Sequence, residues 1–77
     1  MKTKSPGRRF VVCVDNTGYQ ASLEIRKIYE VVPDAAAARL HQLRVIDESG
    51  EDYLFPEDFF LPIELSQEIR AALRKAS

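Results

Sequence analysis

The sequence has few of the residues on which catalysis and metal binding depend. Among its 77 residues there are one histidine, one cysteine and no tryptophan. His41 has no partner near it in the sequence, and Cys13 lies in an apolar segment, where a thiol is usually inert. A zinc site would need carboxylates for most of its ligands, which is rare. We therefore predict that the protein is not an enzyme and has no catalytic residue, metal or cofactor.

The chain also lacks disulfides, a strong net charge and long apolar runs. A single cysteine excludes an intramolecular disulfide and is typical of a reducing compartment, so we predict a cytoplasmic protein. Eleven basic and twelve acidic side chains give a net charge of -1, which argues against nucleic acid as a partner. No apolar run approaches the roughly 20 residues that span a bilayer, and residues 1–10 lack the apolar segment of a secretory signal. We predict no membrane association.

The remaining composition is that of one small globular domain. Hydrophobic residues make up 45% of the chain and charged residues 30%, as in folded rather than disordered proteins. Residues 1–9 carry Lys2, Lys4, Arg8 and Arg9 and have nothing to bury, so we predict a mobile basic tail. A solvated terminus is the simpler role for this tail, and a phosphate-contacting arm is the alternative.

Short apolar segments rich in β-branched residues predict strands. Residues 10–14 form one such segment, which a turn sequence ends. Residues 23–31 alternate in two pieces whose phase changes at residues 26–27, so we predict two strand-like pieces joined by a bend. We predict a loop for "DAAAARLHQ" at residues 34–42, with one helical turn capped by Asp34 as the alternative.

The clearest local signal is a β-hairpin. Two β-prone segments, "LRVID" and "DYLF", flank "ESGE", which predicts a tight turn centred on residues 49–50. A two-residue turn would fix the cross-strand register. The predicted pairs are Glu48 with Glu51, Asp47 with Asp52, Ile46 with Tyr53, and Val45 with Leu54. Two like-charge pairs then lie at the tip, and both faces of the hairpin are apolar.

The second apolar face needs a cover, because a small barrel has only one interior. A C-terminal helix at residues 66–77 is the simplest cover. Ser66 is its predicted N-cap, and Ile69, Ala72 and Leu73 lie on one of its faces. A second copy of the chain, as a homodimer, and an unknown protein partner are the other candidates.

The order of elements predicts the fold class. Pro56 stops the hairpin ladder, "PEDFF" predicts one tight helical turn, and "LPIEL" predicts a short last strand. Five short strands, a long first loop, a tight hairpin and a helical turn are the order found in a small SH3-like barrel. We predict a mainly β fold, with a five-stranded SH3-like barrel at residues 10–65 and the short helix packed on or beside it.

A sequence resemblance agrees with this order. The segment "LFPEDFFLP" resembles the SH3 pattern of apolar residue, proline, two polar residues, aromatic, apolar residue and proline. More closely, the chain resembles small uncharacterised bacterial single-domain proteins with an SH3-like barrel. The matching positions are Leu23, Lys27, Tyr29, Val31, the tip at 47–52, and Phe55-Pro56. Arg26 stands where that family often has glycine, so a positive φ at this bend would carry a steric cost.

Peptide-binding SH3 domains hold polyproline ligands in an aromatic groove. The resemblance matches Pro56 and Phe59 to the groove proline and aromatic of that pattern. The chain has no tryptophan, its first strand reads "FVVCVDN" instead of the "ALYDY" type, and Phe59 has no hydroxyl to bond a peptide. The resemblance therefore implies a fold without conventional polyproline recognition.

Residues 45–60 hold six acidic side chains and no basic one. We interpret the hairpin tip as a solvated surface that discourages edge pairing. The alternatives are a calcium site, although the spacing does not match an EF-hand loop, and a docking patch for a basic partner such as the chain's own Arg8-Arg9.

These observations predict a non-enzymatic module that binds a protein through the hairpin and residues 56–60. The predicted interaction surface comprises Glu48, Glu51, Tyr53, Leu54, Pro56 and Phe59. The alternative function is a small nucleic-acid-binding barrel that uses the basic N-terminal tail.

Overall fold

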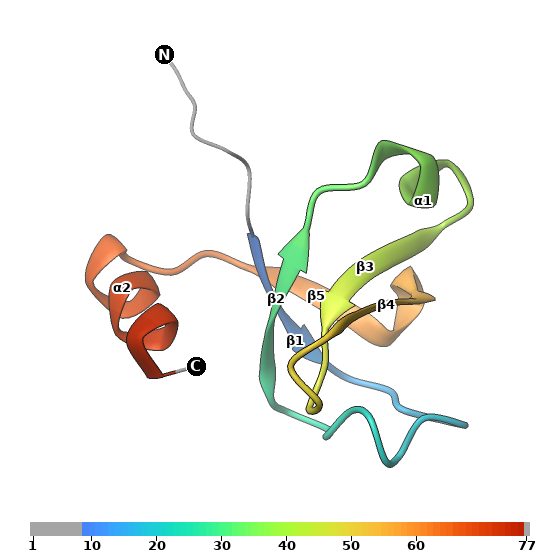
Figure 1. Ribbon diagram of the computed structural model, residues 1–77, viewed down its shortest axis with the longest axis horizontal. Helices are drawn as coiled ribbons and strands as arrows, with labels where there is room; N and C mark the ends of the chain where they lie inside the picture. The colour runs from blue at the N-terminus through green and yellow to red at the C-terminus, as the bar shows by residue number, and fades with distance from the viewer. Residues whose placement is uncertain (1–8, 77) are drawn as a thin grey trace.

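The computed structural model describes residues 9–76. Its main feature is one antiparallel sheet of five strands: β1 (Arg9–Cys13), β2 (Ile28–Val32), β3 (Gln42–Ile46), β4 (Asp52–Pro56) and β5 (Phe60–Ile63). The strand order is β4-β3-β2-β1-β5 (Figure 1). The predicted mainly β fold is confirmed, and within the described residues the sheet is open, with β4 and β5 as its edges. Of the predicted basic tail, residues 1–8 lie outside the described residues, as does Ser77.

Three helical elements complete the fold: α1 (Ala35–Arg39), the 3-10 turn η1 (Glu57–Phe59) and α2 (Gln67–Ala76). The predicted loop at residues 34–42 is wrong, because Asp34 caps α1 and its Oδ1 accepts a hydrogen bond from Ala37 N–H at 2.9 Å. The predicted helical turn in "PEDFF" is confirmed as η1. The predicted cap of α2 is also confirmed, since Ile69 N–H donates to Ser66 Oγ at 3.1 Å.

A loop of consecutive turns joins β1 to β2, and the strand predicted within it at residues 23–25 is wrong. Leu23 is fully buried, yet its N–H donates within the loop to Tyr19 O at 3.0 Å. The predicted bend lies at Arg26, which has a φ of 71° and donates its N–H to Cys13 O at 2.7 Å. A left-handed conformation costs a residue other than glycine about 1 kcal/mol or more.

The hairpin between β3 and β4 is present, but its register differs by one residue from the predicted one. Val45 lies opposite Tyr53 instead of Leu54. Gly50 N–H donates to Asp47 O at 2.9 Å, and Gly50 has a φ of 85°. A three-residue loop that ends in a left-handed glycine therefore replaces the predicted two-residue turn. The predicted like-charge pairs at the tip do not form.

The core lies against one face of the sheet. Its buried residues are Val11, Cys13, Leu23, Tyr29, Val31, Val45, Phe55 and Phe60. A one-residue change of register moves side chains to the opposite face. Val45 and Phe55, which the predicted register separated, therefore share the core face, and the predicted division of the hairpin into two faces is wrong.

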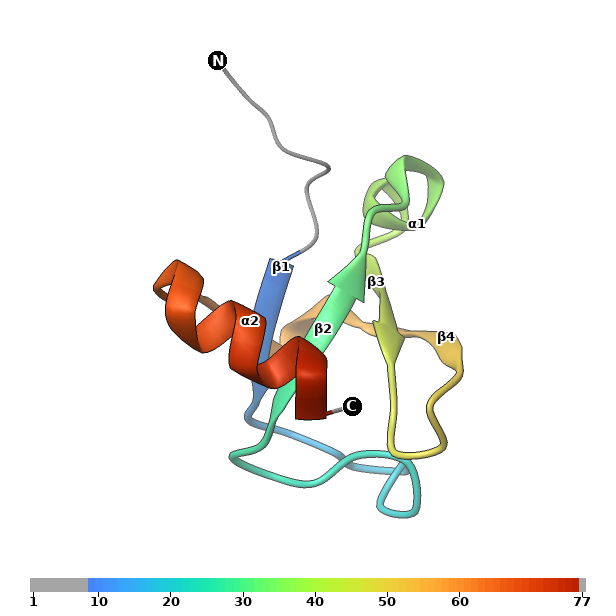
Figure 2. The same ribbon diagram turned by 60° about the vertical axis from the view of Figure 1, so that its left-hand side comes forward.

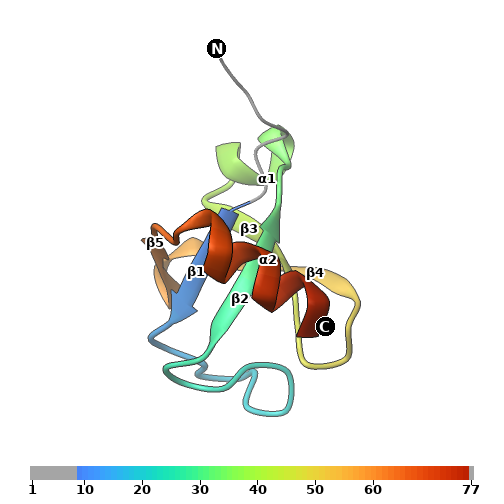
Figure 3. The same ribbon diagram turned by 90° about the vertical axis from the view of Figure 1, so that its left-hand side faces the viewer.

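The C-terminal helix α2 lies across the other face of the sheet, over β1 and β2 (Figures 2 and 3). The Arg70 guanidinium lies 5.2 Å from the centroid of the Phe10 ring, which is buried. Cationic side chains are attracted to the face of an aromatic ring. Leu54 on β4 keeps 38% of its surface exposed, so the helix leaves the hairpin accessible.

Candidate functional site

The hairpin tip is fastened to the β1–β2 loop through Glu48. Its carboxylate accepts hydrogen bonds from Lys27 Nζ at 2.8 Å and from Tyr29 Oη at 2.5 Å. The Tyr29 hydroxyl also accepts a bond from Glu24 N–H at 2.8 Å, and Glu48 N–H donates to Ser22 O at 3.1 Å. These contacts join two segments about 20 residues apart in the sequence and hold the loop beside the hairpin.

The protonation states at this joint are set by the same contacts. The Lys27 ammonium and then the Tyr29 hydroxyl lower the pKa of Glu48, because both donate to its charged form. Burial, followed by the bond to Glu48, raises the pKa of Tyr29. Glu48 is therefore an ionised structural anchor, and its carboxylate is already engaged within the chain.

A shallow cavity of about 410 Å³ lies between the β1–β2 loop and β4. We call it the aromatic groove. The residues that line it are Tyr19, Ser22, Asp47, Ser49, Tyr53, Leu54 and Phe55. Tyr19 and Tyr53 keep 41% and 50% of their surfaces exposed, so the groove presents aromatic area to solvent.

Ring contacts shape the floor of the aromatic groove. The Tyr19 ring meets Phe55 edge to face, with centroids 5.2 Å apart, and Phe59 in a similar way at 5.8 Å. Phe55 is buried and Phe59 packs against the core. The loop aromatic Tyr19 is thus held by two rings that are themselves part of the folded core, which fixes the shape of this face.

Acidic residues lie at the hairpin end of the aromatic groove, and the lining of the groove contains no basic residue. Asp47 is buried, and its Oδ1 accepts bonds from Ser49 N–H at 2.8 Å and from Ser49 Oγ at 2.5 Å, so it closes the turn. Glu51 and Asp52 are exposed. The Tyr53 hydroxyl donates to Glu51 Oε1 at 2.8 Å, which raises the pKa of Tyr53. The rim is therefore negatively charged.

The structure brings most of the predicted surface together at this face. Tyr53 and Leu54 line the aromatic groove, Glu51 lies at its rim, and Phe59 supports it through the Tyr19 ring. Pro56 is half-buried at the end of β4. Glu48 differs from the others, because its carboxylate holds the loop.

Sequence reasoning missed Tyr19. This residue lies in a turn-rich segment, "DNTGYQ", where no strand or helix periodicity points to a buried or functional face. The available signal was a single aromatic residue in an otherwise polar loop, since exposed loop aromatics are common in binding surfaces.

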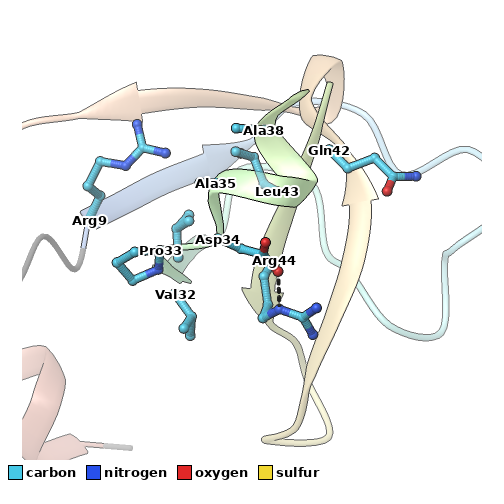
Figure 4. A pocket seen from close by; sticks show the side chains of 10 residues that line it. Arg9, Val32, Pro33, Asp34, Ala35, Ala38, Gln42, Leu43 and Arg44 are labelled. Atoms are coloured by element: carbon cyan, nitrogen blue, oxygen red, sulfur yellow. Dashed lines mark hydrogen bonds and ion pairs between the residues drawn. The ribbon is translucent and has the colours of Figure 1, made fainter. Parts of the chain in front are cut away.

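A second cavity of about 300 Å³ lies at the other end of the sheet, where α1 meets β3 (Figure 4). Arg44 Nε donates to Asp34 Oδ2 at 2.8 Å, and Asp34 also caps α1. The Ala37 N–H and then Arg44 lower the pKa of Asp34. Arg9 also lines the cavity, but its guanidinium lies apart from that of Arg44, beyond Pro33 (Figure 4). We interpret this cavity as a structural joint.

The two residues most often used in catalysis lie outside both cavities. Cys13 is buried, and burial raises the pKa of its thiol. His41 is exposed, with its Nδ1 3.4 Å from Glu57 Oε2. Within residues 9–76, no three His, Cys, Asp or Glu side chains lie close enough to hold a metal ion. Neither described α-helix is both long and apolar enough to span a membrane.

Comparisons with protein-family models, with curated proteins and with solved structures gave no match to this chain. The assignment of a function therefore depends on the geometry of the described surface.

Proposed function

We propose that this chain is a non-enzymatic protein-interaction module that binds an extended peptide segment in the aromatic groove. The observation that carries the proposal is the exposure of Tyr19 and Tyr53 around one cavity of about 410 Å³. Contiguous exposed apolar groups with a polar rim are typical of protein-binding surfaces, where tyrosine is enriched.

We also propose that residues 10–65 form an SH3-like barrel. The strand order β4-β3-β2-β1-β5 supports this fold, as do the long β1–β2 loop, the β3–β4 hairpin and the η1 turn before β5. The fold alone does not define the ligand. A cytoplasmic location is part of the proposal, supported by the single unpaired Cys13.

Selection of peptides from a random displayed library against the whole chain tests the function. We expect the selected peptides to bind with affinities that fall at least tenfold in Tyr19→Ala and in Tyr53→Ala, because truncation at a binding surface removes apolar contact area. Leu61→Ala is the matched control, because Leu61 is 56% exposed on β5, away from the groove. Equal binding to all four proteins, or no enrichment of any peptide, would contradict the proposal.

A further inference from the structure

The backbone of β4 has hydrogen-bonding groups that point away from the sheet. Bonded and non-bonded pairs alternate along an antiparallel ladder. At its two ends, Asp47 N–H donates to Glu51 O and Glu57 N–H donates to His41 O, both at 3.0 Å. Counting inward from either end in the observed register makes Val45–Tyr53 and Leu43–Phe55 the bonded pairs.

The N–H and C=O groups of Asp52 and Leu54 therefore face outward. Within residues 9–76, no backbone bond from another element reaches these two residues. β4 lies at the outer edge of the fold in two views (Figures 2 and 3). The two residues thus present two donors and two acceptors, in the spacing of a β-ladder, directly beside the aromatic groove.

The opposite edge of the sheet offers no such donors. Val14 N–H donates to Phe59 O at 2.7 Å, so the residues of β5 whose backbone faces outward are Phe60 and Pro62. Phe60 N–H is used by Glu57 O, and Pro62 has no N–H. Proline on an edge strand is a common defence against pairing with another chain.

We propose that β4 accepts an added strand from a partner protein, and that this strand alternates apolar residues with lysine or arginine. The proposal rests on the proposed function and names its binding mode. Main-chain bonds to Asp52 and Leu54 would hold the strand, and alternate apolar side chains would enter the groove beside Tyr53.

Charge selects the chemistry of the partner. Glu51 and Asp52 are exposed at this edge, and Asp58 is exposed just beyond β4. No lysine or arginine lies in residues 45–60. A basic strand would therefore be attracted, whereas the β4 edge of a second copy would place carboxylates against carboxylates.

Two synthetic nine-residue probes test the proposal: a capped peptide of alternating lysine and valine, and its counterpart with glutamate in place of lysine. NMR titration of the whole chain measures their affinities and the hydrogen exchange of each amide. We expect the basic probe to bind at least tenfold more tightly than the acidic one and to slow the exchange of the Asp52 and Leu54 amides. Both effects should weaken at high salt.

Two substitutions at one position separate the backbone from the side chain. Leu54→Ala keeps the outward N–H, whereas Leu54→Pro removes it. We expect the basic probe to bind Leu54→Pro at least fivefold more weakly than Leu54→Ala. If Leu54→Pro does not fold, the amide protection in the natural sequence gives the same answer.

Other results overturn strand addition. No binding of the basic probe, equal affinity for both probes, or protection at β5 instead of β4 would each do so. If library-selected peptides need Tyr19 but leave the Asp52 and Leu54 amides unprotected, the proposed function stands and strand addition is wrong.

Discussion

The two edge strands of this sheet are protected in different ways. β5 has no outward donor, because Phe60 N–H is bonded to Glu57 O and Pro62 lacks an N–H. β4 keeps the outward N–H groups of Asp52 and Leu54 and has Glu51 and Asp52 exposed beside them. The missing donors of β5 weaken pairing with any partner strand, whatever its charge. Negative charge repels acidic strands but attracts basic ones, so only the β4 edge can be selective.

The two edges also differ in how they are fastened. β5 pairs along its length with β1, its only neighbour in the described sheet. β4 pairs along its length with β3, and the tip of the β3–β4 hairpin is also held by Glu48 to Lys27 in the β1–β2 loop and to Tyr29 in β2. This joint therefore positions both walls of the aromatic groove at once.

The largest expected effect on stability comes from proline substitution in β4, and it should differ between the neighbouring residues Tyr53 and Leu54. Tyr53→Pro should destabilise the fold by about 3 kcal/mol, because it removes a ladder bond to Val45 and leaves a backbone acceptor unsatisfied. Leu54→Pro should cost less than about 1 kcal/mol beyond Leu54→Ala, because its N–H faces solvent. Urea denaturation measures both, with Tyr53→Ala as the second reference. Equal losses at the two positions would contradict the assigned direction of the β4 backbone.

The second-largest expected effect on stability concerns the hydrogen bond between Tyr29 and Glu48 at the hairpin tip. Tyr29→Phe should destabilise the fold by about 1–2 kcal/mol, since it leaves the Glu24 N–H without its acceptor and removes one of the two donors to the Glu48 carboxylate, whose bond from Lys27 remains. Tyr53→Phe is the matched control, because it removes the same hydroxyl from an exposed bond to Glu51 and should change stability by less than about 0.5 kcal/mol. Equal effects of the two substitutions in thermal or urea denaturation would show that Tyr29 has no special role.

The contacts of Glu48 should also make the unfolding free energy depend on pH, and this effect should be smaller than that of Tyr29→Phe. The pKa of Glu48 lies below its ordinary value of 4.5 in the folded protein. The contribution of the Glu48 carboxylate to the unfolding free energy is therefore complete above pH 4.5 and is lost as the pH falls through the folded-state pKa. Because Lys27 is half exposed, the ion pair should contribute about 1 kcal/mol or less.

A comparison of the natural sequence with Glu48→Gln isolates this contribution. The difference in unfolding free energy between the two proteins should be largest near pH 7 and should shrink as the pH falls below the ordinary glutamate pKa of 4.5 and through the lower folded-state pKa of Glu48. A difference that stays constant across this range would mean that Glu48 acts through packing instead of charge.

The sequence predicts the elements of this fold better than the contacts between them. The hairpin, the η1 turn and the Ser66 cap follow from local chemistry, which the chain carries within a few residues. The register does not, because Ser49-Gly50 suits a two-residue or a three-residue loop, and burial of Val45 together with Phe55 is a long-range condition.

The functional roles show the same division. Tyr53 and Leu54 were predicted as surface residues because a hairpin with apolar side chains on both faces cannot bury both faces in one small core. The anchoring role of Glu48 was missed because Lys27 and Tyr29 are 21 and 19 residues away in the sequence. No local pattern contains that contact, since it depends on how the β1–β2 loop folds back onto the hairpin.

The smallest expected effect on stability comes from substitution of Pro62, which leaves the β5 edge without an outward N–H. Pro62→Ala should cost about 0.5 kcal/mol, mainly through the greater freedom of the unfolded chain. The new amide at position 62 should exchange rapidly with solvent, because it points away from β1, while the neighbouring amide of Leu61 stays slow. Slow exchange at position 62 would place that amide in the β1 ladder and contradict the assignment of this edge. Rapid exchange would mean that the proline at position 62, and not a covering element, prevents β5 from pairing with another strand. The basic probe should then contact both β4 and β5 in Pro62→Ala, but only β4 in the natural sequence.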